Sequence, residues 1–166
     1  MSVKTGVINL TEYEKLLNEA KNNNISVYER YDLSGTQLKG LYCDGAVALS
    51  NELKTSAQRS CVLAEELGHH YTTSGNILDQ NITMNRKQEH RARVWAYRNA
   101  FGLAELISAY KYGCRNRYEI AEHLNVTENF LMDALNHYKT QYGLYAKIDN
   151  YLIYFEPLGV LELNIE

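Results

Sequence analysis

Small and apolar residues recur every three or four positions between residues 55 and 71, and this spacing predicts one amphipathic helix. Thr55 and Gln58 stand at the positions of a capping box, which would begin that helix. Its predicted buried stripe consists of Ala57, Cys61, Ala64, Leu67, Gly68 and Tyr71. Polar residues border this stripe, and they are Glu65, Glu66, His69 and His70.

The residues before this helix predict another helix and three short strands. Thr11 and Glu14 form a capping box, and the asparagine run at 22–24 ends the helix that it opens. Alternating residues predict strands over 25–31, 38–43 and 46–49. Asp44 and Gly45 separate the last two strands and are typical of a tight hairpin turn. We therefore expect a small antiparallel sheet packed on the helix of residues 55–71.

A further helix is predicted over residues 85–100, after a loop that extends from Gly75 to about Met84. Small residues on one face would let this helix lie close to the helix of residues 55–71. That face consists of Glu89, Ala92, Ala96 and Ala100. Residues 86–98 also contain five basic residues against Glu89 alone. This basic face is expected to be solvated or ion-paired. It would alternatively offset a negatively charged site or bind an acidic segment of a substrate.

The last part of the chain predicts helices and a hairpin. A helix begins at Leu103 and ends at Gly113, a short helix follows Asn116, and a longer one covers residues 128–142. A hairpin over 144–155 comes next, so the order resembles a winged helix-turn-helix. The helix of residues 128–142 carries two acidic residues against one basic residue. Because a DNA-reading helix needs cations for phosphates, we do not expect nucleic-acid binding.

Composition narrows the class of protein. The 166 residues are 45% hydrophobic and 22% charged, which is typical of a folded chain with a core. A net charge of −3 provides no general attraction to nucleic acids or anionic membranes. The chain shows no signal-peptide pattern and no apolar run of membrane-spanning length. Its three cysteines form no paired motif, so we expect a cytoplasmic protein without membrane association.

Glu65, Glu66 and His69 are spaced as in a metallopeptidase helix. Side chains four residues apart project side by side, so Glu65 and His69 would hold one divalent metal ion. Glu66 would then act as general base. The first ligand of such a motif is normally His, but carboxylate oxygen also binds zinc. We expect zinc, with manganese or iron as alternatives because the donor set is harder. His70 is a secondary candidate ligand.

The segment resembles the ImmA/IrrE family of metallo-endopeptidases, whose signature reads HELGH where this chain has Glu65 to His69. The family's third ligand is a glutamate on the next helix, and Glu89, Ala92, Trp95 and Ala96 fit that pattern. The resemblance thus implies Glu89 as third metal ligand. The alternative for Glu89 is an ion pair with Arg93 on a solvated helix face.

The resemblance also implies the fold and the partners. We expect an α+β fold, with a zincin-like peptidase core in residues 1–102 and a helical, helix-turn-helix-like segment with a C-terminal hairpin in residues 103–166. The implied activity is cleavage of a protein substrate such as a helix-turn-helix transcriptional repressor, in phages or mobile elements.

Three functions remain open at this point. The first is a metal-dependent endopeptidase. The second is a non-catalytic relative that lost its metal when Glu65 replaced the first histidine and that binds a regulatory protein without cutting it. The third is a DNA-binding regulator that uses the winged segment, which the acidic balance of its longer helix disfavours.

Overall fold

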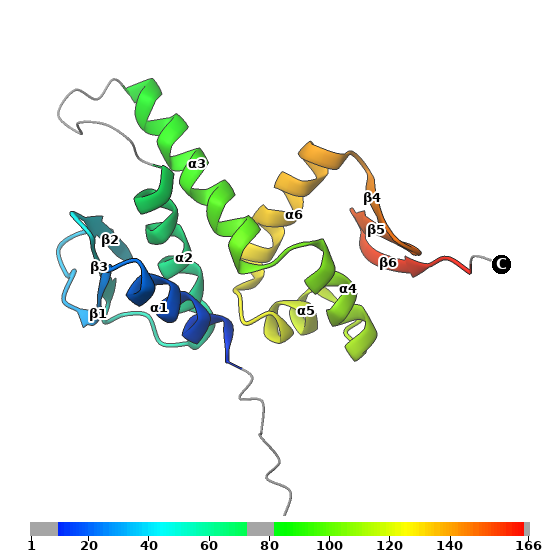
Figure 1. Cartoon of the computed structure of the whole chain (residues 1–166), viewed down its shortest axis with the longest axis horizontal. Helices are drawn as coiled ribbons and strands as arrows, with labels where there is room; N and C mark the ends of the chain where they lie inside the picture. The colour runs from blue at the N-terminus through cyan, green and yellow to red at the C-terminus, as the bar shows by residue number, and fades with distance from the viewer. Residues whose placement is uncertain (1–9, 73–81, 165–166) are drawn as a thin grey trace, which may run out of the picture.

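The structure is a computed structural model that describes residues 10–72 and 82–164. Its described residues form an α+β fold with two three-stranded sheets, so the expected fold class is confirmed (Figure 1). The predicted loop from Gly75 to Met84 lies largely outside the described residues. None of the helices in the described part of the chain combines the length and the apolar character that crossing a bilayer requires.

The first helix, α1 (Glu12–Asn22), has the predicted capping box. The backbone N–H of Glu14 donates to the Thr11 hydroxyl, and the Glu14 carboxylate accepts from the Thr11 backbone at 2.7 Å. The helix buries Tyr13, Leu16 and Ala20. These three residues are spaced by three and four, so one side of α1 packs on the core while the other stays in water.

The first sheet contains β1 (Ser26–Tyr31), β2 (Gly40–Cys43) and β3 (Ala46–Ser50). Strands β2 and β3 form the predicted antiparallel hairpin, and Asp44 and Gly45 in its turn have φ of 45° and 78°. Positive φ at both central residues is the requirement of the turn that suits hairpin twist, which explains the Asp-Gly pair.

The expectation of an all-antiparallel first sheet is wrong. The strand order is β1-β3-β2, and β1 runs parallel to β3. The connection over residues 32–39 carries the chain past the position of β3 to the far edge, where β2 begins. The hairpin then returns β3 into the centre, in the same direction as β1. Strand β2 is therefore an edge strand.

Helices α2 (Ser56–Thr72) and α3 (Ile82–Ala100) are the long pair at the centre of the fold (Figure 1). The predicted cap of α2 is confirmed, because Gln58 N–H donates to the Thr55 hydroxyl at 3.1 Å. One side of α2 contacts α3 and the other contacts β2 and β3. Helix α3 begins at Ile82, three residues earlier than the predicted start at residue 85.

Tyr71 does not belong to the buried stripe of α2. Its side chain is 39% exposed and stacks on Trp95 of α3, with ring centroids 4.8 Å apart. The helix has passed the edge of the core at this point, so the same helical face that is buried at Leu67 reaches solvent one turn later.

The C-terminal helices are α4 (Leu103–Tyr112), α5 (Arg117–His123) and α6 (Glu128–Tyr142). Two predicted signals are confirmed, because Gly113 ends α4 with φ of 113° and Asn116 caps α5. Thr127 caps α6, which was not predicted. These helices contact the first part of the chain directly. The Thr127 N–H donates to Cys61 Sγ at 3.4 Å, and Asn125 Nδ2 donates to Ser56 Oγ at 3.0 Å.

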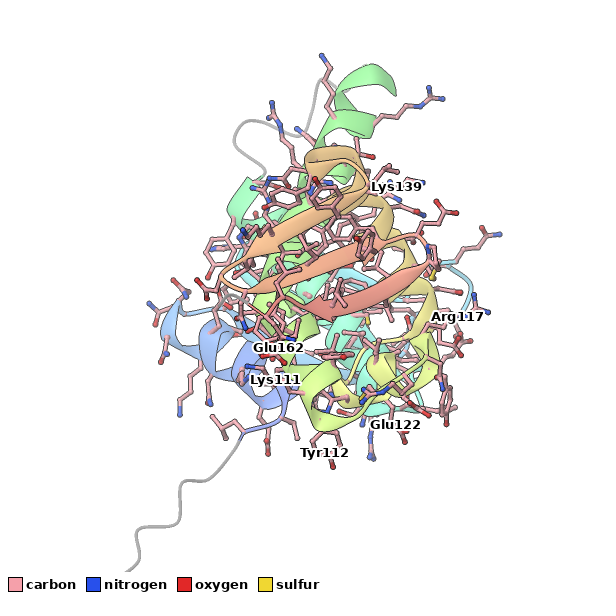
Figure 2. The ribbon with its side chains drawn as sticks, turned by 90° about the vertical axis from the view of Figure 1, so that its right-hand side faces the viewer. Lys111, Tyr112, Arg117, Glu122, Lys139 and Glu162 are labelled. Atoms are coloured by element: carbon pink, nitrogen blue, oxygen red, sulfur yellow. The ribbon has the colours of Figure 1, made fainter. Side chains whose placement is uncertain are left out.

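The second sheet consists of β4 (Tyr145–Ile148), β5 (Tyr151–Phe155) and β6 (Leu158–Glu162), all antiparallel. The hairpin β4-β5 was predicted, whereas β6 was not. Figure 2 shows this sheet facing the viewer, with Lys111 and Glu162 close to one edge. The Lys111 ammonium lies over the Tyr151 ring, and the Tyr151 hydroxyl donates to Glu162 at 2.8 Å.

One hydrophobic cluster connects the described residues from Tyr13 to Phe155. Leu63 and Leu67 of α2 and Leu131 of α6 are among its fully buried members. The division of the chain after residue 102 and the zincin-like arrangement remain predictions.

Candidate metal centre

His69 and Glu89 meet across the pair of central helices. Nε2 of His69 lies 3.6 Å from Oε2 of Glu89, and their side chains are 25% and 56% exposed. They come together because α2 and α3 approach closely at Gly68, the residue before His69. A Cβ added to Gly68 would lie 2.3 Å from the carbonyl oxygen of Ala92, so only glycine permits this approach. The sequence prediction that Glu89 faces His69 therefore agrees with the geometry.

The alternative partner of Glu89 is not used here. Among the described residues, no ion pair joins Glu89 and Arg93, although both lie on the same helix one turn apart. Glu89 instead points to the histidine of the neighbouring helix. Its exposed carboxylate leaves this end of the site open to solvent.

Glu65 lies one turn before His69 on α2 and is partly buried. Burial raises the pKa of its carboxyl group, and the carboxylates of Glu89 and Asp133 raise it further, whereas the Arg93 guanidinium lowers it. Glu65 is therefore near the His69–Glu89 pair and also near residues of α6. A cation at this position would relieve the unfavourable burial of its negative charge.

Glu66 lies against the edge strand β2. A Cβ added to Gly40 would lie 2.6 Å from Glu66 Oε1, so the bare glycine backbone makes room for this carboxyl group. Burial raises the Glu66 pKa to about 7, with Glu65 as the next cause and the backbone amide of Tyr42 acting in the opposite direction. Such a carboxyl group can take up and release a proton near neutral pH, which suits a general base.

His70 is committed to another contact. Its Nδ1 lies 2.8 Å from the Tyr42 hydroxyl, which also accepts a hydrogen bond from the Gly45 backbone at 3.2 Å. This places His70 between α2 and the hairpin rather than in the His69–Glu89 pair. Its candidacy as a ligand, which was secondary in the sequence, remains a prediction.

The donor set fits a metal ion in part. Two ligands of a tetrahedral zinc ion, each about 2.1 Å from it, lie about 3.4 Å apart. The 3.6 Å between His69 and Glu89 is close to that separation. Over residues 10–72 and 82–164, however, no three side chains of His, Cys, Asp or Glu lie close enough together to hold one ion. His69 and Glu89 thus form a pair, and the role of Glu65 as third ligand remains a prediction.

Sequence reasoning missed two residues that shape the site. Gly40 makes room for Glu66, and Tyr42 contacts both Glu66 and His70. Both belong to β2. The sequence predicted this strand, but it did not predict which face of the strand lies against α2. The glycine at the start of an otherwise apolar strand was the available signal, because such a position often marks a close approach.

The chain matches the model of a known protein family. The family model described as the IrrE N-terminal-like domain, a peptidase family, matches residues 19–136. The matched range contains α2, α3, the strands β1 to β3 and most of α6. Neither the curated proteins nor the solved structures yielded a match to the chain.

Proposed function

This chain belongs to the IrrE N-terminal-like domain family of peptidases, and we propose that it is a metal-dependent endopeptidase. One observation carries the proposal: His69 and Glu89, on different helices, approach to 3.6 Å beside the partly buried carboxyl group of Glu66. Two potential ligands and a potential general base are thus positioned by one pair of packed helices.

His69 and Glu89 would hold the divalent ion, and Glu65 would complete the ligand set after a side-chain rotation. Zinc is the expected ion, with manganese or iron as alternatives. When bound, such an ion supplies Lewis acidity, which lowers the pKa of water and polarises the scissile carbonyl group. A cation also offsets the negative charge that Glu65, Glu66 and Glu89 bring together.

Glu66 is the proposed general base and acid. Its carboxylate accepts a proton from the attacking water and returns the proton to the leaving amine. The raised pKa supports this role, because the same group can then act in both directions near neutral pH. Gly40 supports it sterically, since any side chain there would push the Glu66 carboxyl group away.

Strand β2 is the proposed binding edge for the substrate backbone. It pairs only with β3 in the described sheet, and the Tyr42 amide, which acts on Glu66, belongs to it. An extended peptide could add to such an edge through main-chain hydrogen bonds. The peptide would then run past Glu66.

The proposed partner is a regulatory protein, such as a helix-turn-helix repressor, and this rests on the resemblance of the motif. A cytoplasmic location is proposed as well. It is supported by the three free cysteines, Cys43, Cys61 and Cys114, which suit a reducing compartment.

Metal content and cleavage together test the proposal. We expect about one zinc ion per chain after loading and dialysis, and loss of that ion in His69→Ala but not in His123→Ala. His123 is an exposed histidine on α5, so it controls for the removal of an imidazole. Metal content is measured by mass spectrometry of the purified full chain.

Cleavage is measured on a mixed library of synthetic decapeptides by mass spectrometry. We expect Glu66→Gln to keep the metal and to abolish cleavage, with Glu122→Gln on α5 as the control for the same chemical change. Cleavage that persists in Glu66→Gln would contradict the assigned role of Glu66.

The second candidate function is a non-catalytic relative that binds a regulatory protein. Glu65 in place of the motif histidine and the lack of a three-donor group in the described residues favour it. Absence of bound metal after zinc loading, together with absence of cleavage, would select this candidate over the peptidase.

A further inference from the structure

An open groove of about 610 Å³ lies between α3 and α6. We call it the α3–α6 groove, and its walls include His90, Arg93, Arg98, Asp133, Asn136 and His137. A second hollow shares three of these residues and adds Arg91 of α3 to the same surface. The face of α3 that looked merely basic in the sequence therefore forms one wall of a concave surface.

The surface has an excess of positive charge. Arg91, Arg93 and Arg98 are exposed, and none of them forms an ion pair with a carboxylate of the described residues. Asp133 is the acidic residue among the walls. Arg98 donates to Gln141 at 3.3 Å, which keeps its guanidinium over the groove. Unpaired guanidinium groups bind carboxylates through two parallel hydrogen bonds.

His137 provides an independent sign of a polar ligand. Its Nε2 is buried and has no hydrogen-bond partner among the described residues. A covered polar nitrogen without a partner is unfavourable, so a ring rotation that brings Nε2 against a polar ligand in the groove would gain a hydrogen bond. The ring of His90 lies beside it, with centroids 6.4 Å apart, so two imidazoles share this end of the groove.

The groove adjoins the candidate metal centre. Arg93 lies one helical turn beyond Glu89 on α3 and is close enough to Glu65 to lower the pKa of its carboxyl group. Asp133, on the opposite wall, acts on the same carboxyl group. A polypeptide held near Glu65 and Glu66 would therefore have the α3–α6 groove within reach of its neighbouring residues.

We propose that the α3–α6 groove binds an acidic segment of the polypeptide substrate, with Arg93 and Arg98 holding carboxylates and His137 completing the contacts. This inference rests on the proposed function and names the substrate class: proteins with aspartate or glutamate near the cleaved bond. Nucleic acid is the competing occupant of a basic groove, so a DNA duplex is included in the test below.

Binding of fluorescein-labelled hexaglutamate to the full chain tests the proposal by fluorescence anisotropy. Glu66→Gln serves as the parent so that cleavage does not interfere. We expect Arg93→Glu combined with Arg98→Glu to weaken binding at least about tenfold. Lys87→Glu makes the same kind of charge change on an exposed residue of α3 outside the groove, and we expect less than about a twofold change.

Equal weakening by Lys87→Glu would overturn the proposal, because the groove would then have no special role. Tighter binding of a labelled DNA duplex than of hexaglutamate would also overturn it, in favour of a nucleic-acid surface. Circular dichroism confirms that each variant is folded.

A second measurement uses the unchanged chain. We expect hexaglutamate to shift the imidazole NMR signals of His90 and His137 and to leave those of His123, on α5, in place. Absence of these shifts at saturating peptide would overturn the proposal. Because binding is measured apart from metal content and cleavage, a failed groove and a failed peptidase would be seen in different experiments.

Discussion

Single residues decide the chemistry of the candidate site through their surroundings. Glu65 and Glu66 are neighbours in the chain, yet one is near Arg93 and Asp133 while the other lies against Gly40 and the Tyr42 amide. Burial raises the pKa of both carboxyl groups. In the absence of a cation, the burial of their negative charge is unfavourable. The folded chain therefore retains two partly buried acids that a packing argument alone would not favour.

The Glu66 carboxyl group should make stability depend on pH in the metal-free chain. Its folded pKa of about 7 exceeds the ordinary value of 4.5, so the folded state holds a proton that the unfolded chain has lost between these values. The free energy of unfolding therefore falls as pH rises through this window. Glu66→Gln removes the effect, so it should be more stable than wild type by about 1–2 kcal/mol above pH 7.

Urea unfolding at a series of pH values checks this prediction. The advantage of Glu66→Gln should shrink as pH falls toward the ordinary pKa of a glutamate. Glu122→Gln, at an exposed position on α5, should follow wild type throughout. A constant advantage of Glu66→Gln at all pH values would show that packing, and not the charge of Glu66, is responsible.

The cysteines should differ in reactivity. Cys43 is exposed, whereas Cys61 and Cys114 are buried, and burial raises the pKa of the Cys61 thiol to about 11. Because the thiolate is the reactive form, iodoacetamide at about pH 8 should label Cys43 first. Peptide mapping by mass spectrometry reads the sites, and labelling in guanidinium chloride should reach all three. Rapid labelling of Cys61 in the folded chain would contradict its burial.

At the scale of elements, the site depends on how closely α2 and α3 pack. Gly68 meets Ala92 and places His69 opposite Glu89. On its other side, α2 contacts β2, where Gly40 leaves space for Glu66. Helix α2 is thus held between a helix and an edge strand, and a glycine provides the close approach on each side.

Gly68→Ala should separate the two helices. Its new Cβ would lie 2.3 Å from a backbone oxygen, which cannot move aside as a flexible side chain would. We expect a loss of about 1–3 kcal/mol in the free energy of unfolding and weaker zinc binding, because Glu89 is displaced from His69. Urea unfolding and zinc titration measure the two effects.

Gly159→Ala is the matched control for this substitution. A Cβ at Gly159 in β6 meets nothing within 4 Å, so neither stability nor zinc binding should fall appreciably. Equal losses in the two variants would remove the close approach of α2 and α3 as the explanation.

At the scale of the whole molecule, α6 joins the helical pair to the second sheet. The Tyr138 hydroxyl donates to the Phe101 carbonyl oxygen at 2.7 Å, at the end of the segment that leads from α3 into α4. The Tyr138 ring also lies near Phe155 of β5, with centroids 6.2 Å apart. A single buried side chain of α6 thus contacts two other parts of the fold.

Tyr138→Phe should destabilise the entire chain. It removes one buried hydroxyl and leaves the Phe101 carbonyl group without that partner, so we expect a loss of about 1–2 kcal/mol in the free energy of unfolding. Tyr142→Phe, one turn later on α6 and exposed, should change stability by less than about 0.5 kcal/mol. Urea unfolding followed by circular dichroism compares the two variants.

Unfolding of the Tyr138→Phe variant in two separate steps would support the predicted division of the chain into two domains after residue 102. A single step would agree with the continuous hydrophobic cluster that joins Tyr13 to Phe155.

The sequence by itself determined the local elements and the spacing of the site residues. Capping residues such as Thr11 and Thr55, and the Asp44-Gly45 turn, act through contacts within a few residues, so their effect can be read without the fold. The same holds for Glu65 and His69 on successive turns of α2. The family resemblance added Glu89 as a candidate.

Only the tertiary structure decided contacts between distant segments. The parallel pairing of β1 with β3, the pairing of β6, the exposure of Tyr71 and the approach of His69 to Glu89 each depend on how separate elements pack. The α3–α6 groove is of the same kind, since its walls come from helices far apart in the chain. Periodicity states which face of an element is apolar, but it does not state which neighbour covers that face.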